Sequence, residues 1–345
     1  MQEKRGKFTR EEILSQPYTW NDTISCLQKD WGKKNPEIQN YEQVIITGCG
    51  STYYLSIWAA RFLQMSTGIP CISLPSSELW YSGDTWIKPH TKSLLISISR
   101  SGKTTETLHA LDTFLGSNGG DALAITCYAD SPLAKMAPSS IITTAGMEHS
   151  IAQTRSFTNM MWPIIFMGSG NIHDEQIKQI RQSSQKIIDD YQSAALEIGN
   201  SPVFERFFFL GNGPLYGLAQ EVMLKMKEMS LSYSEAYHFL EFRHGPMSMI
   251  NDLSLVVGFI DEHSHEFELP VLRDMQKLGA KTLGVGKSYA PTNKPDFIFS
   301  WNGDIPRQFA YPFYLPLIQL IAYERSMSKG LNPDKPENLT AVVEL

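Results

Sequence analysis

Three hydroxyl side chains and one guanidinium group gather in a single short turn of the sequence. Ser99, Arg100, Ser101 and Thr104 stand within six residues, with Gly102 among them. Hydroxyl and guanidinium groups donate hydrogen bonds to anionic oxygens, and glycine lets the backbone approach a ligand closely. One Ser or Thr would be enough to cap a following helix, so this set exceeds what a cap needs. The turn predicts a binding site for a phosphate monoester.

The place of this turn in the chain favours the same function. It follows an apolar segment at residues 94–98 and precedes a helical pattern at residues 104–115. In a parallel sheet that junction lies at the carboxyl edge of the strands, where ligands bind. The first turn of the helix adds backbone N–H groups and the positive end of the helix dipole.

A companion turn lies earlier in the chain. Gly50, Ser51 and Thr52 follow an apolar segment at residues 44–47 and begin another helical pattern. We expect these residues at the same sheet edge, beside the phosphate; the alternative is a plain strand-to-helix turn with a cap. Cys49 has no neighbouring base in the sequence, so we expect a buried thiol and not a nucleophile.

Two apparent nucleotide-binding motifs fail on spacing. The letters GKT at residues 102–104 resemble the end of a Walker A loop, but the first glycine of that motif would fall at Ser97. The GCG turn at residues 48–50 resembles a dinucleotide fingerprint whose third glycine would be Tyr53. ATP and NAD are therefore not expected as ligands, and we expect no cofactor.

Candidates for proton transfer lie in the second half of the chain. Glu221, Lys225 and Glu228 share one face of a helical pattern that also carries many apolar residues. His244 stands in a turn, where packing gives no reason for a histidine. A carboxylate on a mostly covered helix and a nearby histidine are typical of general acid–base chemistry. The alternative is a solvated pair of charges on the helix surface.

An acidic turn at residues 261–266 takes the place of the phosphate turn in this second half. Its carboxylates would repel a phosphate, so we expect only the first half to bind one. His263 and His265 with the neighbouring acids could suggest a metal, but an exposed acidic loop is the preferred interpretation, and no metal site is predicted.

Short apolar segments alternate with helical patterns along most of the chain. This alternation predicts an α/β fold in which parallel strands are covered by helices on both faces. An N-terminal helical arm is expected over residues 1–35, with Thr9 and Glu12 as a capping box.

Markers in the two halves recur at one spacing. The glycine pairs of the turns at 48–50 and 211–213, and Glu78 with Glu241, are each separated by 163 residues. The regularity predicts an internal duplication. We expect a first domain over residues 36–198, which binds phosphate, and a second over residues 199–345.

Composition restricts the classes of function. The chain has 345 residues, a formal net charge of −6, 42% hydrophobic residues and four cysteines without a CxxC spacing. These values indicate a globular protein with reduced thiols, and they disfavour nucleic-acid or membrane-surface binding. The N-terminus lacks the apolar core of a secretory signal, so a cytoplasmic location is expected.

Five segments carry a resemblance to a known family. In chain order they are GCGST, SRSGKTTE, LKMKEMS, EFRHGP and the tail GLNPDKPENL. Together they resemble the double SIS-domain phosphosugar isomerases, a group that includes the isomerase half of glucosamine-6-phosphate synthase, tagatose-6-phosphate isomerases and amino-sugar-phosphate deaminases. The resemblance covers about residues 40–345 and implies two tandem SIS domains, each an α/β/α sandwich.

The resemblance also implies roles for the residues already singled out. The sugar phosphate would bind at the turn of residues 99–104 and beside residues 50–52, and Gln153 would line the sugar. Glu228, next to Lys225, would move a proton between the first two carbons through an enediol or enolamine. His244 would assist ring opening from the partner subunit of a homodimer with shared active sites.

Departures from the family pattern narrow the reaction. The lysine that forms a Schiff base in the synthase is replaced by Ala341, and residue 2 is Gln2 where the synthase has a nucleophilic cysteine. Glutamine-dependent synthesis is therefore not expected for this chain alone. Isomerisation or deamination of a ketose, aldose or hexosamine 6-phosphate is expected. The alternatives are a deglycase for a phosphorylated sugar–amine adduct and a non-catalytic phosphosugar sensor.

Overall fold

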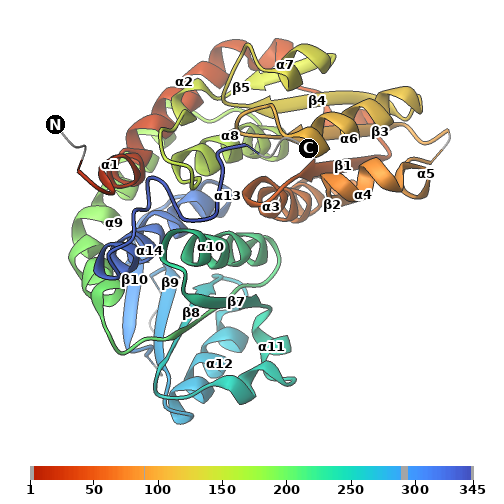
Figure 1. The fold of residues 1–345 in the computed structure, drawn as a ribbon. Helices are drawn as coiled ribbons and strands as arrows, with labels where there is room; N and C mark the ends of the chain where they lie inside the picture. The colour runs from red at the N-terminus through yellow and green to blue at the C-terminus, as the bar shows by residue number, and fades with distance from the viewer. Residues whose placement is uncertain (1–3, 89, 289–293, 343–345) are drawn as a thin grey trace. The chain divides into compact units, whose positions relative to one another are not determined.

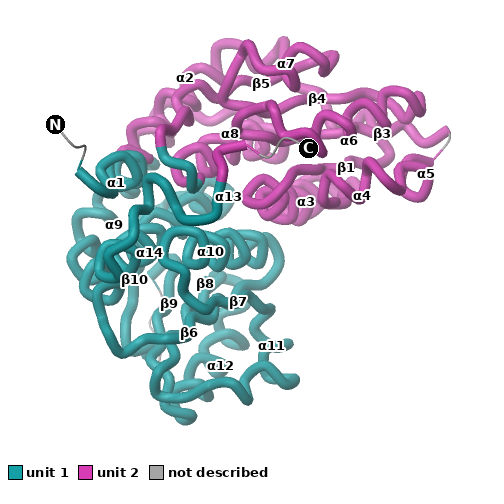
Figure 2. Tube along the Cα trace, viewed as in Figure 1, with its two compact units in different colours: residues 1–14, 150–152, 179–339 teal, residues 15–149, 153–178, 340–345 magenta. Residues whose placement is uncertain are grey.

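The computed structural model describes residues 4–88, 90–288 and 294–342. The chain divides into two compact units (Figure 2). Unit 1 comprises residues 1–14, 150–152 and 179–339, and unit 2 comprises residues 15–149, 153–178 and 340–345. Each unit is made of segments that are not continuous along the chain. The domain boundaries predicted after residues 35 and 198 therefore cannot be compared with them directly and stay a prediction.

Unit 2 is built on a sheet of five parallel strands in the order β2-β1-β3-β4-β5 (Figure 1). The strands are β1 Gln43–Gly48, β2 Cys71–Pro75, β3 Ser93–Ile98, β4 Gly120–Thr126 and β5 Ser139–Ile142. Strands β1 and β3 are buried along their whole length, as expected for central strands covered on both faces. Unit 2 also contains the helices α2 Gln16–Lys34, η1 Ile38–Asn40, α3 Ser51–Thr67, α4 Ser76–Tyr81, α5 Gly83–Trp86, α6 Thr105–Gly116, α7 Pro132–Met136, η2 Thr144–Gly146 and α8 Arg155–Ser169.

Unit 1 contains a second sheet of five parallel strands, in the order β10-β9-β8-β6-β7. The strands are β6 Arg206–Leu210, β7 Tyr233–Tyr237, β8 Ser254–Ile260, β9 Lys281–Lys287 and β10 Phe297–Trp301. Its helices are α1 Lys7–Leu14, most of α9 Asp174–Asn200, α10 Pro214–Ser230, α11 Phe239–Phe242, η3 Pro246–Met249, α12 His265–Lys277, α13 Arg307–Ala310, η4 Tyr311–Tyr314 and α14 Pro316–Ser328.

The two sheets have the same topology. In each, the first strand along the chain pairs with the second on one side and with the third on the other, and the fourth and fifth follow outward. Every pairing of the described strands is parallel, and a parallel pair needs a crossover connection instead of a tight hairpin. The predicted α/β fold is confirmed. The common strand order supports the predicted duplication, which remains a hypothesis about origin.

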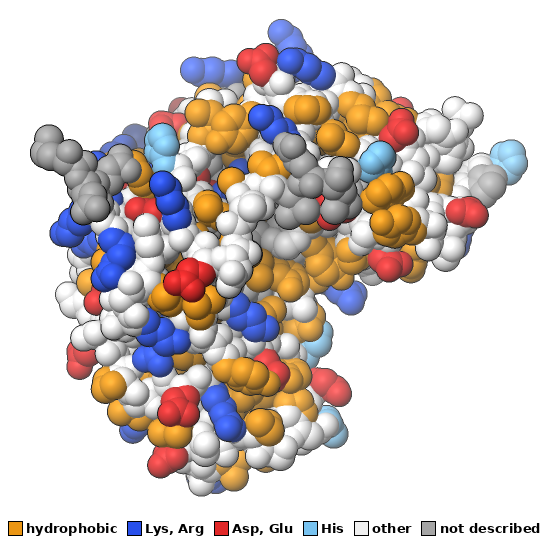
Figure 3. Space-filling model, in the orientation of Figure 1, with side chains coloured by type: hydrophobic (Ala, Val, Ile, Leu, Met, Phe, Trp, Pro, Cys, Tyr) orange, Lys and Arg blue, Asp and Glu red, His pale blue; other side chains and the backbone are white. Residues whose placement is uncertain are grey.

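Each unit closes an apolar core on its own sheet. In unit 2 the side chains of β1, β3, α4 and α6 meet in one buried cluster around Ile45, Leu95 and Phe114. In unit 1 the corresponding cluster joins β6, β8, α11 and α12 around Phe208, Val256 and others. On the face drawn in Figure 3, acidic and basic side chains are interspersed. No helix among the described residues has the length and hydropathy to cross a bilayer.

The predicted capping box at the N-terminus is wrong. Helix α1 begins at Lys7, so Thr9 lies inside it and is fully buried. The Thr9 backbone N–H and hydroxyl both donate to Asp334 Oδ1, at 2.8 Å each. Glu12 accepts hydrogen bonds from the backbone N–H and hydroxyl of Ser150. The two side chains tie distant segments of unit 1 together, a tertiary role that mimics a local capping pattern.

The acidic turn of unit 1 is exposed only in part. Glu262, His263 and Glu266 are exposed as expected, but Asp261 is buried, so the expectation of an exposed loop is wrong for that residue. The Asp261 carboxylate accepts from Nε of Arg307 at 3.1 Å, and this ion pair compensates for its burial.

A buried carboxyl group accepts the hydrogen bonds that this turn can donate. Glu268, on α12, accepts hydrogen bonds from the Asp261 backbone N–H at 2.8 Å, the Ser264 hydroxyl at 2.7 Å and the Asn212 amide at 3.0 Å. The equivalent turn of unit 2, between β3 and α6, carries the predicted phosphate site. Unit 1 therefore satisfies this turn with its own carboxyl group, which agrees with the expectation that only the first half binds phosphate.

Glu268 should make the stability of the protein depend on pH. Burial raises its pKa from 4.5 to about 7. The folded state holds this proton more tightly than the unfolded state, so the stabilisation is complete below about pH 4.5 and is lost as the pH rises through 7. We expect the free energy of unfolding to fall by about 3 kcal/mol between about pH 5 and pH 8. Urea unfolding at several pH values measures this change.

The variant Glu268→Gln should flatten that pH profile, whatever its absolute stability. Glu266→Gln, an exposed residue on the same helix, is the matched control and should keep the wild-type slope. A profile with the same slope in the Glu268→Gln variant would show that another group titrates.

Candidate active site

The turn between β3 and α6 in unit 2 is held in one conformation by its own hydroxyls. Ser99 Oγ accepts the backbone N–H of Gly102 at 3.1 Å and lies 3.1 Å from Thr104 Oγ1. Ser101 Oγ accepts the backbone N–H of Lys103 at 3.2 Å. The three hydroxyls thus lie in one turn and hydrogen-bond within it, and their role as phosphate ligands stays a prediction.

Gly102 is required by both conformation and space. Its φ is +62°, a value that favours glycine, and a Cβ added there would lie 2.3 Å from the Ser131 hydroxyl oxygen. The absence of a side chain lets the turn pack against the segment that begins α7. Any ligand bound by this turn would thus meet a backbone whose path is fixed in advance.

Thr104 does not act as an ordinary helix cap. It is the N-cap residue of α6, but its side chain makes no capping hydrogen bond to the first turn of the helix. Its hydroxyl instead lies against Ser99 and is partly exposed. The alternative interpretation, that the hydroxyls of this segment serve only to cap the helix, does not fit Thr104.

Arg100 is anchored by an acid that the sequence analysis did not single out. The Arg100 residue is only 9% exposed, and its guanidinium forms an ion pair with Glu148 at 3.4 Å. Glu148, whose side chain is fully buried, also accepts from the backbone N–H and hydroxyl of Thr154 at 2.6 and 2.7 Å. Forty-eight residues separate the two partners, so no local pattern in the sequence could have paired them.

Further predicted residues join this network in unit 2. Ser156 donates its hydroxyl to Glu148 and is also 3.4 Å from Gln153 Oε1. The Arg100 guanidinium donates to the backbone oxygen of Ala341 at 3.2 Å. The structure thus connects the phosphate turn, Gln153 and the chain tail through one buried acid.

The companion turn is less available for a ligand than its sequence suggests. Thr52 Oγ1 accepts the backbone N–H of Cys49 at 3.0 Å and donates to the Cys49 carbonyl at 2.9 Å, so it holds its own turn together. Ser51 begins α3 and is buried, and Gly50, the N-cap, has φ +54°. Burial raises the pKa of the Cys49 thiol, which fits the expectation that it is not a nucleophile.

In unit 1 the helix α10 carries the predicted charge ladder. Lys225 is 1% exposed and its ammonium lies 3.5 Å from a carboxylate oxygen of Glu221, which is fully buried. The same ammonium forms a close ion pair with Glu228, whose side chain is 18% exposed. The shared helix face is confirmed, and Glu228 is the member of the ladder that reaches the surface.

His244 lies in the exposed turn between α11 and η3. Its backbone N–H donates to the Glu241 carbonyl at 2.9 Å, and Gly245 next to it has φ +124°. Within the residues that the structure describes, no hydrogen bond or ion pair joins His244 to Glu228. Nor do three or more His, Cys, Asp or Glu side chains of the described segments gather as metal ligands.

Replacing Glu148 tests whether it anchors the turn. Glu148→Gln would leave Arg100 buried beside a neutral amide, and breaking a buried pair costs about 3–5 kcal/mol. We expect a loss of that order in the free energy of unfolding, measured by urea denaturation. The double variant Arg100→Gln with Glu148→Gln should recover part of the loss, because it removes the stranded charge. Glu78→Gln, at an exposed acid of unit 2, is the control. If Glu148→Gln and Glu78→Gln were equally stable, Glu148 would not anchor the turn.

Comparison with known proteins agrees with this geometry. The family model "SIS domain" matches residues 37–164 and 204–290, more than half of the chain. A glutamine–fructose-6-phosphate aminotransferase (isomerizing) from Pyrococcus horikoshii is 28% identical over 99% of this chain, and a homologue from Methanothermobacter thermautotrophicus is 27% identical. The chain spans about three fifths of the length of these curated relatives.

Solved structures share the fold along nearly the whole chain. A tagatose-6-phosphate ketose/aldose isomerase from Escherichia coli superposes with a TM-score of 0.85 at 22% identity, covering 96% of this chain and 95% of the other. A glucosamine-6-phosphate deaminase from Thermotoga maritima gives a TM-score of 0.82 at 25% identity, covering 98% and 99%. With two matched segments, one on each parallel sheet, the chain belongs to the SIS-domain family.

Proposed function

We propose that this protein is an enzyme that isomerises or deaminates a sugar 6-phosphate without a protein Schiff base. The observation that carries the proposal is the turn of residues 99–104, in which the partly exposed Ser101 and Thr104 lie at the start of α6 and the Thr104 side chain does not cap the helix. A phosphate monoester suits such a turn because hydroxyls and helix N–H groups donate to its oxygens. The names of the relatives, which act on fructose 6-phosphate, tagatose 6-phosphate or glucosamine 6-phosphate, support this substrate class.

In this proposal the phosphate is bound by Ser99, Ser101 and Thr104, with residues 50–52 beside it. Arg100 serves chiefly to hold the turn in place, because its charge is already balanced by Glu148. Gln153, joined to the same network, lines the sugar.

Glu228 is the proposed general base. It would remove a proton from the carbon beside a carbonyl or imine, which gives an enediol or enolamine, and return it to the neighbouring carbon. Lys225 supports this role, because a buried ammonium next to Glu228 fixes the carboxylate in one orientation and balances its charge. His244 would assist ring opening, and we propose that a second copy of the chain supplies it in a homodimer.

The identity of residue 341 bears on the class of reaction. In the synthases that the chain resembles, a lysine in the tail forms a Schiff base, whereas Ala341 has no amine. Isomerisation or release of the substrate's own amine requires no such lysine, so both fit this tail. The proposal does not include glutamine hydrolysis.

Removing the proposed base should abolish turnover without abolishing binding. Glu228→Gln keeps the shape of the side chain but cannot accept a proton, and general-base loss typically costs 10²–10⁴-fold in rate. We expect at least a loss of roughly 10²-fold in kcat, while a sugar phosphate still raises the melting temperature. Glu197→Gln, an exposed acid on α9, is the control. Unchanged turnover in the Glu228→Gln variant would end the catalytic assignment.

Removing two hydroxyls of the turn should weaken binding of phosphorylated sugars. Ser101→Ala combined with Thr104→Ala deletes two donors, each worth about 1.5 kcal/mol or more to a charged acceptor, so the Kd should rise by about 10²-fold. Calorimetric titration with a sugar 6-phosphate measures the change. The control deletes two hydroxyls at the other end of α6, Thr113→Val with Ser117→Ala. Wild-type affinity in the double alanine variant would place the anion site elsewhere.

Solvent exchange distinguishes an enzyme from a sensor. In deuterated water an isomerase or deaminase should replace the proton on the carbon beside the carbonyl or imine of its substrate, which is the second carbon of an aldose and the first carbon of a ketose. ¹H NMR detects this exchange as loss of a signal. We expect this exchange with at least one member of a panel of hexose and hexosamine 6-phosphates, and ammonia release separates deamination from isomerisation. Binding without exchange across the panel would favour the sensor, and amine release from a sugar–amine adduct alone would favour a deglycase.

A further inference from the structure

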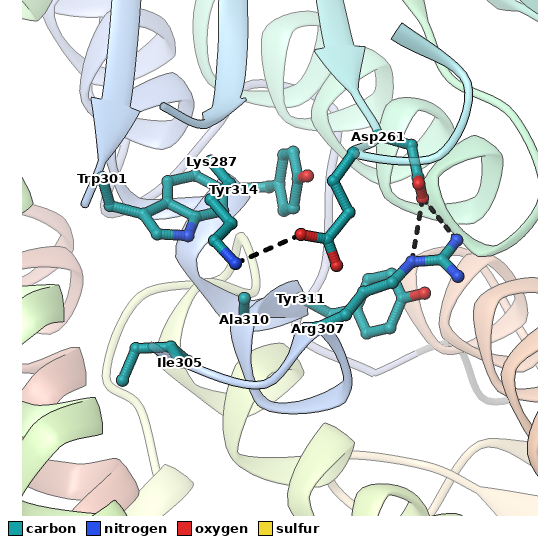
Figure 4. A pocket seen from close by; sticks show the side chains of 9 residues that line it. Asp261, Lys287, Trp301, Ile305, Arg307, Ala310, Tyr311 and Tyr314 are labelled. Carbon is teal, nitrogen blue, oxygen red and sulfur yellow. Dashed lines mark hydrogen bonds and ion pairs between the residues drawn. The ribbon is translucent and has the colours of Figure 1, made fainter. Parts of the chain in front are cut away.

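A small pocket lies in unit 1 at the carboxyl ends of β8, β9 and β10. Figure 4 shows the side chains that surround it, including Asp261, Lys287, Trp301 and Arg307. The carboxyl edge of a parallel sheet is where ligands bind in such folds. The cavity belongs to unit 1 alone and contains none of the residues assigned above to catalysis or phosphate binding.

One wall of this cavity holds a buried donor. Trp301 is 4% exposed, and its indole N–H has no hydrogen-bond acceptor within the described part of the chain. Edge-to-face contacts with Phe313 and Tyr314, at centroid distances of 5.7 and 4.9 Å, fix the ring. The nitrogen faces the same space as the ammonium of Lys287 (Figure 4). A buried unsatisfied donor costs free energy, so a ligand that supplies an acceptor would be stabilised there.

The charges around the cavity balance one another. Lys287 Nζ lies 3.2 Å from Glu262 Oε2, and Arg307 is paired with Asp261. A ligand with a single charge of either sign would lie near two carboxylates and two cationic groups, so its attraction to one pair would be offset by repulsion from the other. A dianion gains nothing from the adjoining turn, because Glu268 already accepts from its donors.

The pair of Lys287 and Glu262 is the one that a ligand can open. Their side chains are 39% and 33% exposed, and a partly exposed pair contributes only about 0–1 kcal/mol. A molecule with both a carboxylate and an ammonium group can replace each partner of the pair with one of the same charge. Its carboxylate would accept from Lys287 and from the Trp301 indole N–H, and its ammonium would donate to Glu262.

We propose that this cavity binds a small zwitterion of the α-amino acid type. The pocket is small and partly open to solvent, so it would hold the charged groups of such a molecule, with Ile305 and Ala310 as apolar surface for a short side chain that extends outward. The site is independent of the proposed sugar-phosphate chemistry, so each can fail without the other.

The Trp301 indole N–H gives a direct readout. The chain has seven tryptophans, so a ¹H–¹⁵N spectrum of the whole protein contains few indole signals, and Trp301→Phe identifies one by its loss. Alanine, serine and leucine should each shift that signal. Lactate has only the carboxylate, ethylamine has only the ammonium group and glucose has neither. Each should shift the Trp301 signal far less at the same concentration.

Variants complete the test by calorimetric titration with the tightest of these amino acids. Trp301→Phe and Glu262→Gln should each weaken binding by roughly tenfold, as expected for one hydrogen bond to a charged group. Trp86→Phe, whose indole nitrogen is likewise buried but lies in unit 2, should bind as wild type does. The proposal is overturned if no amino acid shifts the Trp301 signal, if lactate or glucose binds equally well, or if both cavity variants keep wild-type affinity.

Discussion

A buried carboxylate, Glu148, is the interaction on which the candidate phosphate site of unit 2 depends. It is fully buried, so each of its oxygens must be satisfied by donors inside the protein. Those donors come from Arg100 in the phosphate turn and from Thr154 and Ser156 at the start of α8. One acid thereby fixes the end of β3 against the start of α8, and through Arg100 it also holds the backbone of the tail at Ala341.

The fold class and the central strands of the first half could be predicted from the sequence. Central strands such as β1 and β3 are continuous apolar runs that end at Gly48 or at the hydroxyl-rich turn, and these boundaries are local signals. The capping box at Thr9 and Glu12 failed because a pattern of two residues cannot say whether its partners are local or distant. Both side chains are buried against segments that lie more than a hundred residues away along the chain.

In the candidate site, too, the local arrangements could be predicted and the contacts between distant segments could not. The hydroxyl turn and the ladder of Glu221, Lys225 and Glu228 are local arrangements, and periodicity alone was enough to find them. Glu148 was missed because its partners come together only in the folded chain. The burial of Asp261 was missed because Arg307, which compensates for it, is 46 residues away and carries no motif of its own.

The position of Glu268 has a consequence for how paired domains can diverge. The donors of the turn before α12 are satisfied by a side chain of the helix that the turn precedes, so this turn needs no bound anion. Turns at the same place in two sheets of one topology can thus be satisfied either by the protein itself or by a ligand. A shorter side chain at position 268 would leave the Asp261 N–H and the Ser264 hydroxyl without an acceptor, and a chloride or sulfate ion could then bind to them.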